Sequence, residues 1–166
     1  MKKLNRRGYM TVEIIIASVI AFSIAFFLME ITMKLVDVTD NEYADTNFMT
    51  DKALIMTNVK KYVKEYLDEL KSNDDQIMSF TCQQNNCDFE SSENSSRIHL
   101  GKDIENDNTL IFKKEETILY SKTLDNGIKI NSLTGGNKGN YIYFQIKCTN
   151  IFSDEDYNIN IVVYNG

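Results

Sequence analysis

An apolar run near the N-terminus constrains this chain more than any other feature of its sequence. From Tyr9 to Met29 there are 21 residues, and Glu13 carries the only charge among them. About 20 apolar residues are enough for a helix to cross a bilayer. Four basic residues lie just before the run: Lys2, Lys3, Arg6 and Arg7. They favour a cytoplasmic N-terminus with the remainder of the chain outside, so we expect one membrane-spanning helix.

The end of this run argues against an ordinary secretory signal peptide. Such a peptide has an apolar core of about 7–15 residues followed by small residues at a cleavage site, whereas this run ends in FFLMEITMKL. Glu13 then needs an explanation, because an ionised side chain inside a bilayer costs about 2.5–3.5 kcal/mol. Either Glu13 lies at headgroup depth, near the positive end of the helix dipole, or its charged partner comes from outside the run.

The segment RRGYMTVEIIIASVIAF combines a basic leader, a glycine, a glutamate five residues later and a long apolar helix. In this combination it resembles the N-terminus of the type IV pilin-like family, which includes type IV pilins, type II secretion pseudopilins and competence pseudopilins. Gly8, Tyr9, Thr11 and Glu13 match the family pattern position by position. The resemblance is confined to this segment, and the whole combination is far more specific than any one of its residues.

The resemblance implies that a prepilin peptidase cuts between Gly8 and Tyr9 and commonly methylates the new amine of Tyr9. Cleavage would remove four positive charges and create a cationic amine four residues before Glu13. In a filament, Glu13 would pair with the amine of a neighbouring subunit, and Thr11 belongs to the same assembly segment. The implied partners are the peptidase, other pilins or pseudopilins and the lipid bilayer before assembly, with a membrane platform and an assembly ATPase acting indirectly.

A second apolar pattern predicts that the helix continues beyond the membrane. Five residues recur at three- and four-residue spacing, which is typical of one face of a helix: Ile55, Val59, Tyr62, Tyr66 and Leu70. We expect the helix to end at about residue 71, and the stretch DVTDNEYADTN to be weak enough for an interruption. The expected divisions are a leader at 1–8, a transmembrane or filament-core helix at 9–34 and an extracytoplasmic globular domain at 35–166.

After the helix, the sequence predicts a polar loop and then an antiparallel sheet. Residues 72–108 are rich in Asn and Ser, and their apolar content is too thin for a core, so we expect a surface loop there. Residues 109–166 contain segments that predict strands: TLIFKK, TILYSK, GIKIN, YIYFQIKCT and YNINIVVY. KKEET and SLTGGNKGN would be turns. The predicted fold class is α+β and pilin-like, with the second half of a long N-terminal helix packed on a small antiparallel sheet.

Three cysteines and one histidine are the candidates for chemistry. Cys148 shares a strand face with core residues, so we expect a buried thiol, which leaves Cys82 and Cys87 for a disulfide that closes a short loop. His99 stands in no recognisable catalytic order, and we therefore expect no enzyme. The cysteine loop lacks the further ligands of a zinc site, and the acidic loop at 103–107 departs from a calcium-loop pattern. We expect no metal and no cofactor.

The charge balance excludes one class of partner. The net charge is −6, and without the first eight residues 14 basic residues face 24 acidic ones, a net charge of −10. Such an acidic domain argues against direct nucleic-acid binding. We expect a minor pilin or pseudopilin, located in the cytoplasmic membrane and then in a pilus or pseudopilus at the cell surface, that serves secretion, DNA uptake, adhesion or motility. The alternative is an uncleaved, signal-anchored extracellular binding domain.

Overall fold

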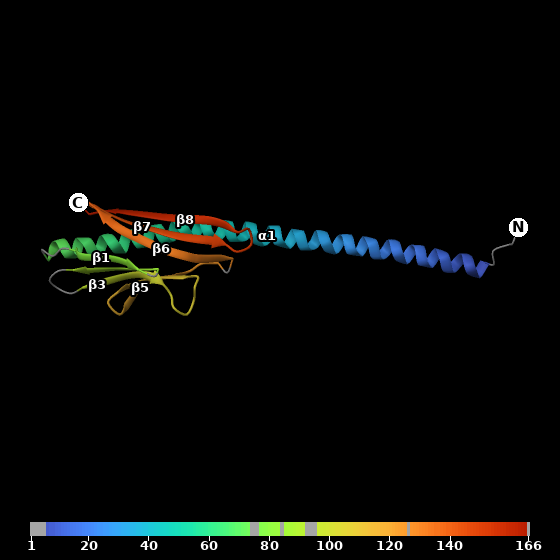
Figure 1. Cartoon of the computed structure of the whole chain (residues 1–166), viewed down its shortest axis with the longest axis horizontal. Coiled ribbons are helices and arrows are strands. Elements are labelled where there is room, and N and C mark those ends of the chain that lie inside the picture. The colour runs from blue at the N-terminus through green and yellow to red at the C-terminus, as the bar shows by residue number, and fades with distance from the viewer. Residues whose placement is uncertain (1–5, 74–76, 84, 92–95, 126, 166) are drawn as a thin grey trace. The chain divides into compact units, whose positions relative to one another are not determined.

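The computed structural model describes residues 6–73, 77–83, 85–91, 96–125 and 127–165, which form one long helix followed by eight strands (Figure 1). The elements are α1 (Arg6–Ser72), β1 (Ile77–Gln83), β2 (Asn86–Ser91), β3 (Arg97–Lys102), β4 (Thr109–Lys114), β5 (Thr117–Thr123), β6 (Ile128–Lys138), β7 (Tyr141–Asn150) and β8 (Glu155–Tyr164). The chain divides into two compact units, Met1–Thr39 and Asp40–Gly166. We call the second unit the head domain.

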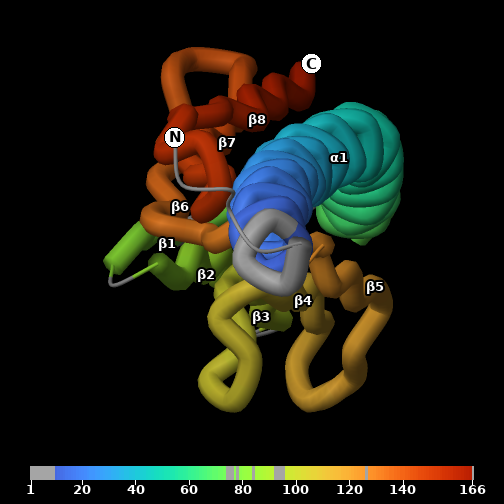
Figure 2. The backbone as a smooth tube through the Cα atoms, turned by 90° about the vertical axis from the view of Figure 1, so that its right-hand side faces the viewer, coloured from blue at the N-terminus to red at the C-terminus, as the bar shows by residue number. Residues whose placement is uncertain are grey.

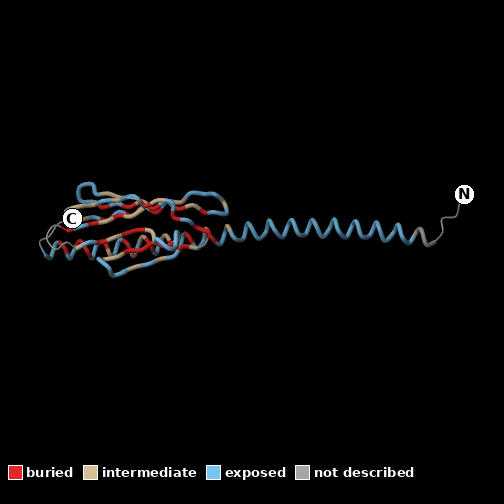
Figure 3. Tube along the Cα trace, turned by 60° about the horizontal axis from the view of Figure 1, so that its bottom comes forward, coloured by how far each residue is buried: buried red, intermediate tan, exposed pale blue. Residues whose placement is uncertain are grey.

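In its described part, the first unit is the N-terminal half of α1, and every side chain from residue 10 to residue 39 is exposed (Figure 3). The chain has no proline that would break the helix. The hydroxyl groups of Ser18, Ser23 and Thr32 donate to carbonyl oxygens three or four residues earlier, at 2.8–2.9 Å. These polar groups are thus satisfied within the helix, as an apolar surrounding requires.

The second half of α1 buries one stripe of side chains in the head domain. The buried residues recur mostly every three or four positions: Ala44, Phe48, Ile55, Val59, Val63, Tyr66, Leu67 and Leu70. Tyr62, which the sequence also places on this stripe, is half-buried, and its ring stacks on that of Phe112 with the centroids 5.8 Å apart. The helix ends at Ser72, one residue beyond the predicted end.

The stretch DVTDNEYADTN is helical throughout, so the expected interruption is wrong. Polar side chains of this stretch find partners in the strands. The fully buried amide of Asn150 donates to Asn41 Oδ1 at 2.7 Å and to Asp45 Oδ1 at 2.9 Å, and the Tyr157 hydroxyl also donates to Asp45. An unpaired buried polar group costs about 1–3 kcal/mol, and these contacts hold the helix against β7 and β8.

The first sheet is antiparallel, with the strand order β1-β2-β3-β4-β5. Its first three strands lie within residues 72–108, so the prediction of a surface loop there is wrong. Buried side chains alternate along two of them, with Cys87 and Phe89 on β2 and Ile98 and Leu100 on β3. A half-buried strand needs an apolar side chain only at every second position, and for that reason overall polarity misled the prediction. The KKEET turn between β4 and β5 is confirmed, with Glu115 at φ 53°.

The second sheet is antiparallel as well, with the order β6-β7-β8. The predicted turn at SLTGGNKGN is mostly wrong, because β6 extends through Lys138 and the turn is confined to Gly139 and Asn140. Gly135 is tightly packed against β1, since a Cβ there would be 3.0 Å from Phe80 Cζ of β1. This glycine marks a close approach within a strand, whereas Gly139, at φ 58°, serves a turn.

The described part of the head domain therefore has two sheets and not the one that the sequence predicts. Rings from both sheets meet in one core: Phe80 of β1, Phe89 of β2 and Phe144 of β7 pack with centroids 4.4–5.9 Å apart. In Figure 2 the second sheet lies to the left of the head domain's part of α1, and strands β3 to β5 of the first sheet lie below it. The predicted fold class is confirmed: an α+β fold in which a long N-terminal apolar helix packs against antiparallel sheets.

Candidate functional site

The predicted processing and assembly residues lie at the beginning of α1. The backbone of Gly8 and Tyr9 is helical, and the side chains of Thr11 and Glu13 are exposed. Residues 1–5 of the predicted leader lie outside the described residues. Tyr9 and Glu13 are four positions apart, so both lie on one face of the helix. The carboxylate is therefore one turn from the position that cleavage would convert into an amine.

Around and after Glu13, the helix presents apolar side chains on every side. Ile14, Phe22 and Phe26 are 65%, 76% and 78% exposed. A helix that is apolar all round belongs in a membrane or in a protein core. By length and composition, α1 is the one helix in the described chain that could cross a membrane; its most apolar window has a mean hydropathy of 2.5 and is not buried at all. The segment thus fits a single-pass membrane anchor.

The cysteines are structural. Cys82 and Cys87 form the predicted disulfide and are direct cross-strand partners in β1 and β2, so the bond closes this hairpin near its turn. Cys148 in β7 is fully buried, as predicted, and burial raises the pKa of its thiol to about 12. Because the thiolate is the reactive form of cysteine, Cys148 packs the core and is unsuited to chemistry.

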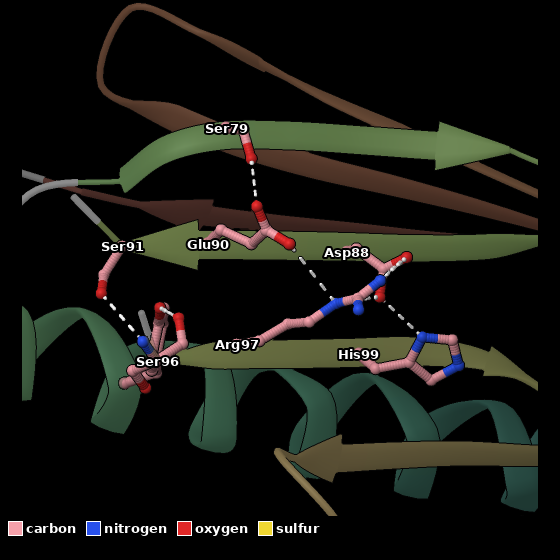
Figure 4. A network of polar contacts seen from close by, with 8 residues as sticks. Ser79, Asp88, Glu90, Ser91, Ser96, Arg97 and His99 are labelled. Atoms are coloured by element: carbon pink, nitrogen blue, oxygen red, sulfur yellow. Dashed lines mark hydrogen bonds and ion pairs between the residues drawn. The ribbon is translucent and has the colours of Figure 1, made fainter. Parts of the chain in front are cut away.

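The register of β2 and β3 creates a polar network on the head domain (Figure 4). Asp88 Oδ1 lies 2.8 Å from His99 Nδ1, and Asp88 Oδ2 lies 3.0 Å from Arg97 Nη2. Glu90 lies 3.7 Å from Arg97 Nε and accepts a hydrogen bond from Ser79 at 3.4 Å. Sequence reasoning missed this network, because the cross-strand pairing of Asp88 with His99 depends on a register that no sequence pattern states.

The network holds Asp88 in its ionised form. Burial has the largest effect on this carboxyl and raises its pKa, but hydrogen bonds from His99 and Arg97 together outweigh burial and hold the pKa of Asp88 below its usual value. The hydrogen bond to Asp88 raises the pKa of the Arg97 guanidinium in turn. Asp88 thus fixes His99 through Nδ1, and the imidazole is held in place on the sheet surface.

A pocket of about 370 Å³ lies beside this network and contains charges of both signs. Lys102 and Lys113 line it together with Asp103 and Glu115. Position 101, next to the network, needs a glycine, because a Cβ there would collide with Asn86 Oδ1 and His99 Nε2. The pocket contains charges of both signs and the Asp88 carboxylate is already paired, so the site favours neither an anionic nor a cationic ligand. We therefore interpret the network as a set of contacts that fixes the register of β2 and β3.

The acidic loop that begins at Asp103 is organised by its own polar contacts. Asp103 accepts a hydrogen bond from the backbone N–H of Glu105 at 3.3 Å, and Asp107 lies 2.7 Å from Lys102 Nζ. In the part of the chain that the structure describes, no group of three or more His, Cys, Asp or Glu side chains is placed to hold a metal ion. In this loop the Asp103 carboxylate stabilises a turn and the Asp107 carboxylate forms an ion pair.

Comparison of this chain with protein-family models, with curated proteins and with solved structures gives no match. Its class therefore follows from the residues and their arrangement alone. The chain is an α+β protein whose two antiparallel sheets pack on one long helix, and the apolar N-terminal part of that helix could anchor it in a membrane.

Proposed function

We propose that this chain is a structural subunit, a minor pilin or pseudopilin, which a prepilin peptidase processes and which assembles through the N-terminal half of α1. One observation carries the proposal. Glu13 is the only charged residue between positions 10 and 29, on a segment of helix whose side chains are all exposed. An unpaired charge is costly in lipid and in a packed core, so we infer that another subunit supplies the partner of Glu13.

Cleavage between Gly8 and Tyr9 would supply this partner. A free α-amine has an ordinary pKa of about 7.7–8.0 and is largely cationic at neutral pH. When helices stack in a filament, the amine of one subunit would meet Glu13 of the next. Such a pair sets the register of the helices, because a shift along the axis leaves both charges unpaired in an apolar surrounding.

The same cleavage would change how the chain is held in the membrane. Residues 1–8 contain four basic residues and no acidic one, and this charge opposes withdrawal of the helix from the bilayer. After processing, the apolar surface of residues 10–39 is free to exchange lipid contacts for contacts with neighbouring helices. The proposed location is therefore the cytoplasmic membrane, with the head domain outside, and then a pilus or pseudopilus at the cell surface. The machine would serve secretion, DNA uptake, adhesion or motility.

Incorporation into filaments tests the role of Glu13. The full-length chain, Glu13→Ala and Glu30→Ala would be expressed in a host that assembles type IV pilus-like filaments, and the sheared filament fraction would be blotted. Glu30 is a matched control, because it lies on the same helix but forms an exposed ion pair with Lys34 at 2.9 Å. We expect Glu13→Ala to reduce incorporation at least tenfold, while Glu30→Ala incorporates normally and all three insert in the membrane.

The alternative, a signal-anchored binding domain in which Glu13 lies at headgroup depth, makes the opposite prediction. In that case the chain stays in the membrane fraction with residues 1–8 attached, and Glu13→Ala has the same distribution as Glu30→Ala. Equal incorporation of the two variants would remove the pairing role of Glu13 from the proposal.

A further inference from the structure

Strand β8 forms an open edge of the second sheet. It pairs with β7 on one side, and among the described residues no strand pairs with its other side. The backbone N–H of Asn165 donates to the Asn140 carbonyl oxygen at 2.6 Å, which fixes the phase of the ladder. In an antiparallel pair, hydrogen-bonded residues alternate, so the odd-numbered residues of β8 bond to β7. The N–H and C=O groups of Asn158, Asn160, Val162 and Tyr164 consequently point toward the open edge.

A groove runs beside this edge, between β8 and the head domain's part of α1. It has a volume of about 310 Å³. Its lining combines basic residues of the helix with the end of the strand: Lys60, Lys64, Leu67, Asp68, Lys71, Val162, Val163 and Tyr164. Lys60 and Lys64 are exposed and form no ion pair within the described residues. In a chain of net charge −6, this groove is a local concentration of positive charge.

On the opposite flank of α1, beside the edge strand β5, ion pairs join the helix to the first sheet. Glu69 Oε2 lies 2.6 Å from Lys114 Nζ, and Asp51 Oδ1 lies 2.6 Å from Lys122 Nζ. There the charges of the helix are matched by charges of the sheet. Among the residues that the structure describes, the β8 flank lacks such a match at Lys60 and Lys64, and its strand edge is open as well.

Apolar side chains on the outer face of the second sheet border the same edge. Val162 and Tyr164 of β8 are 52% and 57% exposed, and Tyr141 and Tyr143 of β7 are 52% and 45% exposed. Tyr141 and Tyr164 are cross-strand partners with ring centroids 5.2 Å apart. An additional strand at the β8 edge would have lysines on one of its faces and this tyrosine stripe beside the other.

We propose that the β8 edge binds an extended acidic segment of a partner protein as an additional strand. Main-chain hydrogen bonds to an exposed sheet edge provide affinity in this mode, and alternate side chains provide specificity. Acidic side chains of the segment would point to Lys60 and Lys64, and the alternating apolar ones would contact Val162 and Tyr164. The occupant is thus a segment in which acidic and apolar residues alternate. This inference is independent of the proposed role of Glu13.

A defined peptide tests the charge requirement. The probe is a fluorescent eight-residue peptide in which glutamate alternates with valine, titrated into the detergent-solubilised full-length chain and followed by anisotropy. We expect saturable binding that weakens at least tenfold in the double variant Lys60→Glu, Lys64→Glu and at high salt. The double variant Lys129→Glu, Lys147→Glu is the matched control, because both lysines are exposed, form no ion pair within the described residues and lie outside the groove, and it should bind as the wild type does.

The backbone requirement needs a second variant and a second peptide. Val162→Pro removes an N–H at the open edge and leaves the bonds to β7 in place, and a peptide N-methylated at alternate residues loses half of its donors. Either change should reduce binding at least tenfold. Equal binding to the two lysine double variants would overturn the proposal, as would equal binding of a peptide in which lysine replaces glutamate. A dimer of the chain that forms without peptide and is lost in Val162→Pro would also overturn it, with a second copy as the occupant.

Discussion

The two halves of α1 share one secondary structure and have opposite relations to their surroundings. Every side chain from residue 10 to residue 39 is exposed, although most of them are apolar. After residue 40, one apolar stripe of the helix is almost fully buried (Figure 3). Residues 10–29 are apolar on all faces, while the second half has charged residues opposite its stripe. The fold of this chain therefore buries only the second half of α1. The apolar first half must be buried by lipid or by another protein.

The largest expected effect comes from removing an isoleucine side chain in each half. Ile55 is 1% exposed and Ile20 is 54% exposed. Ile55→Ala should lower the free energy of unfolding of the head domain by about 2–5 kcal/mol, whereas Ile20→Ala should change it by less than about 0.5 kcal/mol. Denaturant unfolding of the full-length chain in detergent, followed by circular dichroism, measures both. A comparable loss in the two variants would mean that the first half packs on protein within the monomer.

Ion pairs give a second, smaller test of the same contrast. Asp51 has a side chain that is only 11% exposed and pairs with Lys122, while Glu30, at 62%, pairs with Lys34 on the first half. Lys122→Met leaves a nearly buried carboxylate without its partner and should cost about 1–3 kcal/mol. Lys34→Met should cost less than about 0.5 kcal/mol, because an exposed pair contributes little. The same unfolding curves report both values, and a larger cost at Lys34 would contradict this assignment.

Acid unfolding gives the smallest effect and concerns the head domain alone. The pKa of Asp88 is below its usual value in the folded state, so its ionised form contributes stability above pH 3.8, the ordinary pKa. This contribution is lost as the pH falls below that value toward the folded-state pKa. Between pH 5 and pH 2 the melting temperature should therefore fall further in the wild type than in Asp88→Asn. Parallel pH profiles for the two proteins would remove the proposed role of the His99 and Arg97 hydrogen bonds.

The contrast within α1 also shows what the sequence could and could not predict. Period and composition predicted the apolar segment, the stripe from Ile55 to Leu70, the disulfide and the burial of Cys148. Strands β1 to β3 were missed because overall polarity hides the alternation of a few buried residues such as Phe89 and Leu100. Contacts that depend on register or on chain topology, such as Asp88 with His99, lie beyond any local pattern.

Two glycines show the same limit of prediction from local sequence. Gly135 and Gly139 lie four residues apart in the segment SLTGGNKGN, and both predict a turn. In the structure Gly135 lies inside β6 beneath a contact with β1, and only Gly139 adopts a positive φ. The difference arises from the packing of one sheet on another, which a sequence pattern does not contain.

The mass of the N-terminus tests the central proposal most directly. The full-length chain and Gly8→Val would each be coexpressed with a prepilin peptidase that cuts a known prepilin in the same cells, and intact-protein mass spectrometry would follow. We expect the wild type to lose residues 1–8 and to begin at Tyr9, with or without one methyl group, while Gly8→Val keeps its full length. A wild-type chain that retains Met1 to Gly8 while the known prepilin is cut would contradict the proposed function.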